Sequence, residues 1–139
     1  MGKYGLDWNK DIENFTDKDW AVLLAETTKI ITAKIIRTEK DVLEVGFAFY
    51  DRGIYYDCKG EYDKAIADYT SAIERIIDFA HGYYNRGLTY WDMKQYNKAL
   101  DNFNEALRLI PKVAPPDAIE KDIQRTRKCI KRIIEEMNS

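Results

Sequence analysis

Hydrophobic residues recur three and four positions apart along most of this chain, with polar residues between them. This spacing is that of an α-helix with one buried face. The first stripe predicts a helix over 17–37 and consists of Trp20, Leu23, Leu24, Thr27, Ile30, Ile31 and Ile35. The last stripe predicts a helix over 117–137 and consists of Ile119, Ile123, Thr126, Ile130, Ile133, Ile134 and Met137. Four more helices are expected between them, over about 39–59, 62–78, 81–94 and 96–110.

Short polar motifs mark where these helices begin and end. Thr16 and Thr38 are each followed three residues later by an aspartate, the spacing of a capping box at a helix start. Gly60 suits the left-handed residue that ends a helix, and Gln95 in the corresponding turn suits it less well. Two prolines at 115–116 indicate a stop followed by a new helix. The pattern therefore predicts an all-α fold of about six helices.

One stretch of the chain is repeated with a period of 34 residues. The run Phe49-Tyr-Asp-Arg-Gly-Ile-Tyr-Tyr returns as Tyr83-Tyr-Asn-Arg-Gly-Leu-Thr-Tyr, without a gap. Small residues and rings recur in the same register; they are Gly53, Gly87, Ala65, Ala99, Ala106, Tyr69 and Phe103. A glycine inside a helix costs about 1 kcal/mol relative to alanine. Its recurrence predicts a close approach of two helices, with the aromatic rings filling the space beside it.

These residues resemble a tetratricopeptide repeat, a family with small and aromatic residues at this spacing. The second copy reads Tyr83-x2-Arg86-Gly87-x2-Tyr90, then Ala99-x3-Phe103, then Pro111. Arg52 and Arg86 replace the usual leucine, and Ile77 replaces the closing proline of the first copy. We interpret both arginines as structural, with the stem along the helix interface and the head in water or stacked on a ring.

The resemblance implies an α-solenoid of helical hairpins, here a single domain over 1–139. It divides into a flanking helix and connection over 16–45, two repeats over 46–79 and 80–113, and a capping helix over 115–137. A solenoid needs about three repeats for stability, so the flanking helices are expected to complete the stack. The last helix has a charged outer face, as a cap should.

The resemblance also implies a concave groove lined by the first helix of each repeat. Its expected residues are Phe47, Tyr50, Asp51, Ile54, Asp57, Cys58, His81, Tyr84, Asn85, Leu88, Trp91 and Asp92. Because the acids would repel a carboxylate, we expect the groove to prefer a hydrophobic or mildly basic segment over an acidic chaperone tail. An alternative is that the last helix, or a second copy of the chain, fills this surface.

Composition excludes several other classes. The net charge of −2 gives no support for nucleic-acid or membrane binding, and no apolar stretch is long enough to span a bilayer. The N-terminus lacks the apolar core of a secretory signal, so the cytoplasm is the expected location. Two cysteines and one histidine, His81, form no metal or catalytic motif, and no phosphate-binding loop occurs. We therefore expect no cofactor and no metal.

The sequence thus predicts a non-enzymatic protein–protein interaction module, such as an adaptor, co-chaperone or regulator. It would bind a peptide or helix in the aromatic groove. The alternative is a structural module whose repeat surfaces mediate homo-oligomerisation. An enzyme with an unfamiliar carboxylate site is a third hypothesis, disfavoured by the single histidine. The sequence does not identify the partner.

Overall fold

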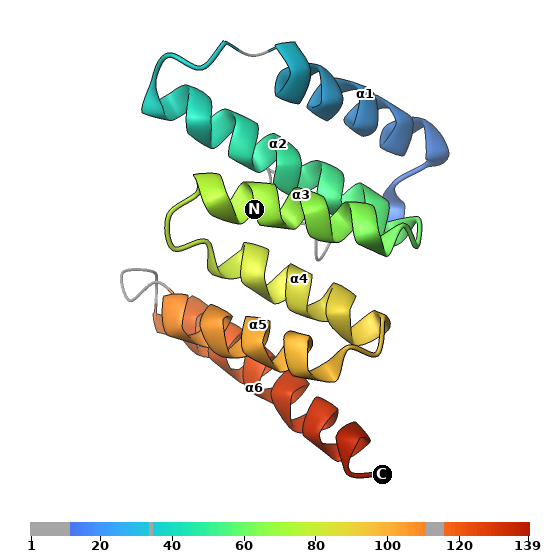
Figure 1. The fold of residues 1–139 in the computed structure, drawn as a ribbon, viewed down its shortest axis with the longest axis vertical. Helices are drawn as coiled ribbons and strands as arrows, with labels where there is room; N and C mark the ends of the chain where they lie inside the picture. Colours follow the sequence, from blue (N-terminus) through green and yellow to red (C-terminus); the bar gives the residue numbers. More distant parts are fainter. Residues whose placement is uncertain (1–11, 34, 111–115) are drawn as a thin grey trace. The chain divides into compact units, whose positions relative to one another are not determined.

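The computed structural model describes residues 12–33, 35–110 and 116–139, and within these ranges it contains six α-helices and no strand (Figure 1). A short 3-10 turn, Ile12–Asn14, precedes them. The helices are α1 Asp17–Ala33, α2 Glu39–Cys58, α3 Tyr62–Arg75, α4 Ala80–Asp92, α5 Tyr96–Leu109 and α6 Pro116–Met137. The predicted all-α fold is confirmed, and each helix lies close to its expected position.

The chain divides into two compact units, Met1–Ile77 and Asp78–Ser139. In the first unit α2 and α3 form a hairpin, and α1 packs against α2. In the second unit α4 and α5 form the corresponding hairpin, and α6 packs against α5. Each unit therefore contains one copy of the 34-residue repeat with one flanking helix. The single domain over 1–139 stays a prediction.

In each hairpin, a glycine of the first helix faces an aromatic ring of the second helix. A Cβ atom placed on Gly53 would lie 2.8 Å from the ring of Tyr69, and one on Gly87 would lie 3.1 Å from the ring of Phe103. Both rings are buried, as are the alanines that share their face of the second helix. The predicted close approach at the repeat glycines is confirmed. It lets the two helices of each hairpin bury large rings at the density of a protein interior.

Helix α1 ends at Ala33, earlier than the predicted residue 37. The reason is the capping box that begins α2, in which the Thr38 side chain accepts a hydrogen bond from the Asp41 amide. One oxygen of the Asp41 carboxylate also accepts from the amides of Thr38 and Arg37, both at 3.0 Å. These bonds hold the chain out of the helical conformation there. Ile35, predicted to be part of the buried stripe, is instead 66% exposed.

Helix α3 ends at Arg75, before the predicted residue 78. Ile76 has an extended backbone (φ −105°, ψ 112°), and its side chain is buried beside Gly46. The following Ile77 is 89% exposed. Burial of Ile76 against α2 therefore takes the place of the missing closing proline in ending the first repeat. Pro111, which would close the second repeat, and Pro115 lie outside the described residues.

Each of the two hairpin turns has a residue in the left-handed backbone conformation, at the same position of the repeat. In the first turn it is Gly60, with φ of 75°, as predicted. In the second turn it is Lys94, with φ of 60°, and not Gln95. Lys94 lies 34 residues after Gly60, so the repeat register, more than side-chain preference, decides which residue takes this conformation.

The apolar stripe of α6 is only partly buried. Thr126 and Ile133 are buried, whereas Ile134 and Met137, expected on the same inner face, are 46% and 43% exposed. Ile134 directly follows the most deeply buried residue of α6, so helical geometry turns it about 100° away from the interface. The predicted capping helix is thus present, with a narrower buried face than the sequence indicates.

Candidate partner-binding surfaces

Helix α6 lies over part of the α4 surface that the sequence assigns to the groove. The core of this unit is formed by Ala99, Phe103 and Ile133, and Tyr84, Leu88 and Trp91 pack against it. Ile133 comes from α6 and Phe103 from α5, so the aromatic face of α4 meets two helices of its own unit. For these groove residues, the structure shows the alternative in which the chain's terminal helix covers the surface.

Polar and charged groups of α6 complete this contact. The Trp91 indole nitrogen donates a hydrogen bond to Glu136 at 2.9 Å, and the Arg132 guanidinium lies 5.4 Å from the Trp91 ring centre. The Tyr84 hydroxyl lies 3.6 Å from the Cys129 sulfur. Arg125 stacks over the same tyrosine at 4.8 Å. The α4 face therefore binds a helix through apolar contact in the middle and cation–π contact on both rings.

His81 contacts the beginning of α6. Its Nε2 atom lies 3.8 Å from Asp122, which also accepts a hydrogen bond from Arg125 at 2.9 Å. Burial lowers the pKa of His81, although half of its side chain faces solvent. These residues border a small cavity of about 110 Å³ near the first turn of α4.

The remaining groove residues on α4 are placed differently. Asn85 is half-buried, and its main-chain carbonyl accepts a hydrogen bond from Thr89. Asp92 is exposed, and desolvation raises its pKa. The structure thus brings four of the six predicted α4 residues, His81, Tyr84, Leu88 and Trp91, to α6 or to the core that α6 completes.

The predicted groove residues on α2 belong to the first unit. Tyr50, Asp51 and Ile54 are buried, and Phe47 and Asp57 are half-buried. Cys58, at the end of the helix, is exposed as a residue, although partial desolvation of its thiol and the nearby Asp57 raise the pKa of Cys58 to about 11, so the reactive thiolate is disfavoured. Because α2 and α4 lie in different units, a groove that spans both helices stays a prediction.

The repeat arginines are held by the second helix of each hairpin. Arg52 donates to both oxygens of Asp68, at 2.7 and 2.9 Å, and Arg86 donates to the Asn102 side chain at 2.7 Å. Asp68 and Asn102 occupy equivalent repeat positions. The predicted stacking is present, since Arg86 lies 5.2 Å from the ring centre of Tyr83. The alternative interpretation, in which each guanidinium extends into water, is wrong, because each donates to a buried polar side chain of the second helix.

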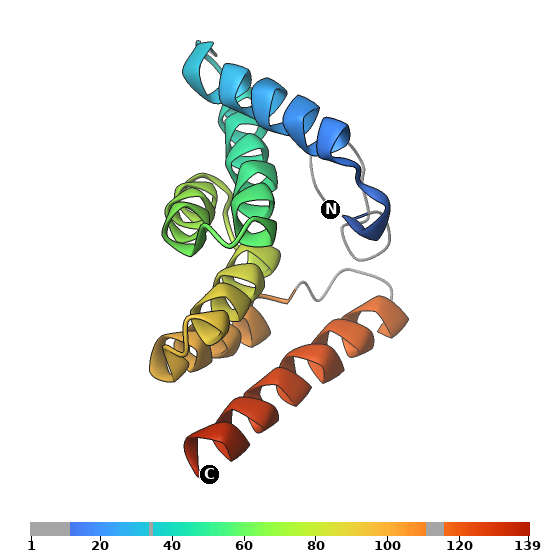
Figure 2. The ribbon, with the colours of Figure 1, turned by 90° about the vertical axis from the view of Figure 1, so that its right-hand side faces the viewer.

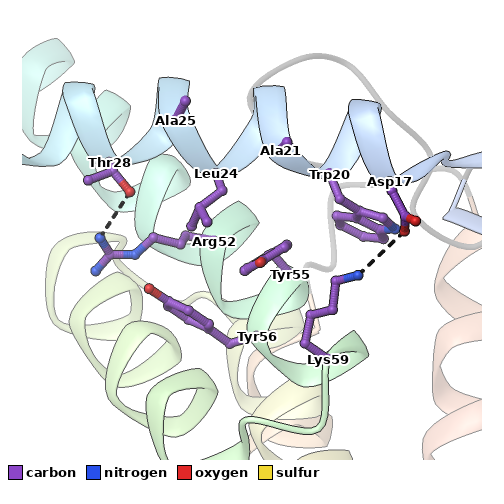
Figure 3. Close-up of a pocket in the computed structure, with 10 residues that line it drawn as sticks. All are labelled: Asp17, Trp20, Ala21, Leu24, Ala25, Thr28, Arg52, Tyr55, Tyr56 and Lys59. Carbon is purple, nitrogen blue, oxygen red and sulfur yellow. Dashed lines mark hydrogen bonds and ion pairs between the residues drawn. The ribbon is translucent and has the colours of Figure 1, made fainter.

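A crevice that the sequence did not predict lies between α1 and α2 in the first unit (Figure 3). Its volume is about 640 Å³. Figure 2 shows the two helices diverging from the connection between them. The crevice lies toward the open end and is lined by Asp17, Trp20, Ala21, Leu24, Ala25, Thr28, Arg52, Tyr55, Tyr56 and Lys59.

The crevice is apolar in the middle and polar at both ends. Trp20, Leu24 and Tyr55 project into the middle from opposite helices (Figure 3). At one end Arg52 donates from Nη1 to the Thr28 hydroxyl at 3.4 Å. At the other end the Lys59 ammonium lies 3.7 Å from the Asp17 carboxylate. Each end of the crevice therefore contains a cationic side chain, Arg52 at one end and Lys59 at the other.

Residues 80–113, which include α4 and α5, match the model of the tetratricopeptide repeat. This segment is therefore similar to a tetratricopeptide repeat. No curated protein matches the chain. The expected family resemblance is confirmed, and the tetratricopeptide repeat supports a role in binding other proteins.

Among the described residues, no cluster of three or more histidine, cysteine or acidic side chains has the geometry of a metal site. No helix in the described ranges is long and apolar enough to cross a membrane. Around the tetratricopeptide repeat, the side chains that converge are aromatic and cationic, a combination suited to holding a peptide or a helix.

Some of the crevice residues could have been noticed in the sequence, because they differ between the two repeats. Arg52 and Tyr56 recur in the tetratricopeptide repeat as Arg86 and Tyr90, whereas Tyr55 and Lys59 become threonine and methionine. The recurring pair supports the hairpin, and the non-recurring pair faces α1. Only the packing of α1 shows that these differences adjoin an open space.

Proposed function

We propose that the chain is a non-enzymatic adaptor that binds a helical segment of a partner protein on the aromatic face of α4. The observation that supports this most directly is α6 itself. Tyr84, Leu88 and Trp91 pack against the core to which this amphipathic helix contributes Ile133, and this packing supports a surface that fits a helix. Binding of an amphipathic helix in an apolar groove is a recurrent mode of protein recognition.

The contacts of α6 describe the partner that this surface fits. Ile133 supplies the apolar contact, and Arg125 and Arg132 stack over the rings of Tyr84 and Trp91. A partner helix would therefore carry aliphatic residues one turn apart with arginine or lysine beside them. This chemistry agrees with the hydrophobic or mildly basic segment that the acidic groove residues favour.

In this proposal, the contacts between α6 and the rest of its unit are few enough for a partner helix to compete with α6. Only Thr126 and Ile133 of its 22 residues are buried. The indole hydrogen bond to Glu136 is exposed, and exposed polar contacts contribute little net stability. In this proposal α6 protects the aromatic face until a partner helix displaces it.

A labelled peptide with the sequence of residues 116–139 tests the proposal by binding to the full chain. Ile133→Asp should loosen the chain's own α6 and raise the affinity for the peptide at least tenfold. Adding Trp91→Ala to this variant should abolish the gain. Tyr62→Ala, an aromatic truncation in the first unit, serves as the control. Equal peptide affinity for the wild-type and Ile133→Asp chains, with both folded by circular dichroism, would contradict the proposal.

A milder variant protects the experiment against unfolding. Arg132→Ala combined with Glu136→Ala removes both contacts to Trp91 and leaves the buried Ile133 in place. This double variant should raise the peptide affinity several-fold. Affinity purification followed by mass spectrometry, with the wild type and Trp91→Ala side by side, would then identify the partner. Proteins lost with Trp91→Ala are those held by the α4 face.

Self-assembly is the second candidate, favoured by the exposed apolar side chains at the end of α6. Ile134 and Met137 lie one turn apart and are both more than two-fifths exposed. Two copies could meet there or exchange their terminal helices. Light scattering over a range of concentrations separates the candidates. A mass that stays that of one chain supports the adaptor, and a mass that doubles with concentration supports assembly.

A further inference from the structure

We propose that the crevice between α1 and α2 is a second binding site, for a short acidic segment of a partner protein. The segment would carry large apolar residues between two carboxylates. This site lies wholly within the first unit and shares no residue with the α4 face. Its predicted charge preference is also the opposite of that of the groove.

The middle of the crevice has the size and lining of a ligand site. Its volume of about 640 Å³ falls within the range of pockets that hold small ligands or short peptides. Tyr55 and Tyr56 of α2 and Leu24 of α1 supply apolar and aromatic surface. Ala21 and Ala25 are small, so α1 leaves space that a partner's leucine or phenylalanine side chain would fill.

The Arg52 end of the crevice has a donor to offer to a carboxylate. Its Nε and Nη2 atoms already bind Asp68, which holds the guanidinium in place and raises its pKa. Nη1 points to the Thr28 hydroxyl, at the long distance of 3.4 Å. A carboxylate between these two groups would accept a shorter, charge-assisted bond.

The Lys59 end is held by a contact that a ligand would readily replace. The Asp17 carboxylate is fully exposed, and its 3.7 Å separation from the ammonium is longer than a hydrogen bond. The Lys59 side chain is 41% exposed and carries a flexible charge. A second carboxylate from a bound segment would take the place of Asp17, whose own side chain is free to turn into water.

The spacing of the two cations defines the ligand further. Arg52 lies on α2 and Lys59 is the residue that caps its C-terminal end, seven positions later and about 10 Å along the helix axis. In a segment with the polyproline II conformation, carboxylates three residues apart lie on one face and span about 9 Å. The shortest matching segment is therefore Glu-Leu-Leu-Glu, with its apolar residues over the middle of the crevice.

Comparison of the two repeats indicates that these residues are not required by the hairpin. At the positions of Tyr55 and Lys59, the second repeat has Thr89 and Met93 and forms the same helix pair. Exchanging each residue for its counterpart should therefore preserve the fold. This provides variants that test binding separately from stability.

The experiment measures fluorescence polarisation of a labelled acetyl-Gly-Glu-Leu-Leu-Glu-Gly peptide titrated with the full chain at low salt. The wild type should bind it at least tenfold more tightly than the matching Gln-Leu-Leu-Gln peptide. Lys59→Met should reduce the affinity at least tenfold, and Tyr55→Thr several-fold. Lys98→Met, the same charge change in the second unit, should alter it less than twofold.

Three results would overturn the proposal. The first is no binding of the acidic peptide at millimolar protein concentration. The second is equal affinity for the acidic and the glutamine peptides, which would indicate apolar adhesion only. The third is an equal loss with Lys59→Met and Lys98→Met, which would indicate attraction to net charge and not to the crevice. Circular dichroism of each variant confirms that the helices are retained.

Discussion

The two repeat glycines face aromatic rings at different distances, and this difference has a measurable consequence. A methyl group on Gly53 would overlap the ring of Tyr69 at 2.8 Å, and Tyr69 is only 1% exposed. On Gly87 the nearest ring atom of Phe103 is at 3.1 Å, which a shift of a few tenths of an ångström relieves. The same substitution therefore meets two different environments in one chain.

We expect Gly53→Ala to destabilise the fold by about 1–2 kcal/mol, because overpacking outweighs the helix preference of alanine. Gly87→Ala should change the free energy of unfolding by less than about 1 kcal/mol, since the two effects nearly cancel. Urea unfolding followed by circular dichroism measures both. A larger loss for Gly87→Ala than for Gly53→Ala would contradict the packing described for the hairpins.

The repeat arginines also differ in what their removal leaves behind. Arg52→Ala would strand the buried carboxylate of Asp68 and should cost about 2 kcal/mol. Arg86→Ala would leave a neutral amide, and Asn102 would keep its bond to the Lys98 carbonyl at 2.8 Å, so a loss of about 1 kcal/mol is expected. Thermal and urea unfolding of both variants check this order.

Asp68→Asn is the matched control, because it reproduces the arginine–asparagine pair of the second repeat. It should cost less than Arg52→Ala, because the asparagine amide oxygen would still accept a hydrogen bond from the Arg52 guanidinium, whose side chain is 17% exposed. Equal losses for the two variants would show that the ion pair itself, and not the stranded carboxylate, determines the cost.

At the scale of the helical elements, the turn between α4 and α5 carries a conformational cost that the α2–α3 turn avoids. Lys94 has φ of 60°, a region that costs a residue with a Cβ atom about 1–2 kcal/mol. Glycine removes this cost but loses more entropy on folding. Lys94→Gly should therefore stabilise the chain by about 0.5–1 kcal/mol, measured by urea unfolding.

The neighbouring Met93 provides the control for the turn. It has φ of −78°, where glycine relieves no strain. Met93→Gly should accordingly destabilise the chain. A stability gain at both positions would mean that the turn is strained for a reason other than the backbone conformation of Lys94.

At the scale of the whole molecule, the single histidine makes the pH dependence of stability simple to interpret. Burial lowers the pKa of His81 from its ordinary value of 6.5, so folding favours the neutral ring. The unfolded chain then binds more protons than the folded chain near that pH. This contribution to stability is complete above pH 6.5 and is lost as the pH falls toward the lowered pKa.

We therefore expect the melting temperature of the wild type to fall between pH 7.5 and 5.5. His81→Gln should show a smaller fall over the same range. Asp122 opposes the shift and Arg125 reinforces it, so the effect should be modest. Differential scanning fluorimetry at closely spaced pH values checks it. Identical pH profiles for the two chains would contradict a contribution of His81 to the pH dependence of the contact between α4 and α6.

The division into two units also shapes the proposed function. Each unit has a repeat hairpin with one flanking helix, and the two proposals assign one binding surface to each unit, the crevice in the first and the α4 face in the second. The two proposed surfaces are expected to favour segments of opposite charge. An adaptor of this kind would gain affinity from a partner that presents both segments within one chain.

The local features of this protein were predictable from its sequence because each is encoded within a few neighbouring residues. Thr38 and Asp41 form a capping box through bonds that span three residues. The 34-residue repeat predicted the hairpins because Gly87 and Phe103 lie only 16 positions apart. Helix type, repeat register and the notches for aromatic rings all follow from such short-range patterns.

The candidate binding surface could be predicted less completely than the helices, because a stripe of hydrophobic residues does not specify what covers it. Tyr84 and Trp91 were predicted to line an aromatic groove, and only the folded chain shows α6 against them. The helix lies about 45 residues further along the chain, and no pattern within either segment encodes their pairing. The crevice at Tyr55 depends in the same way on where α1 packs. Short-range periodicity thus determined the helices and hairpins, whereas the closed and open surfaces were decided by contacts between distant residues.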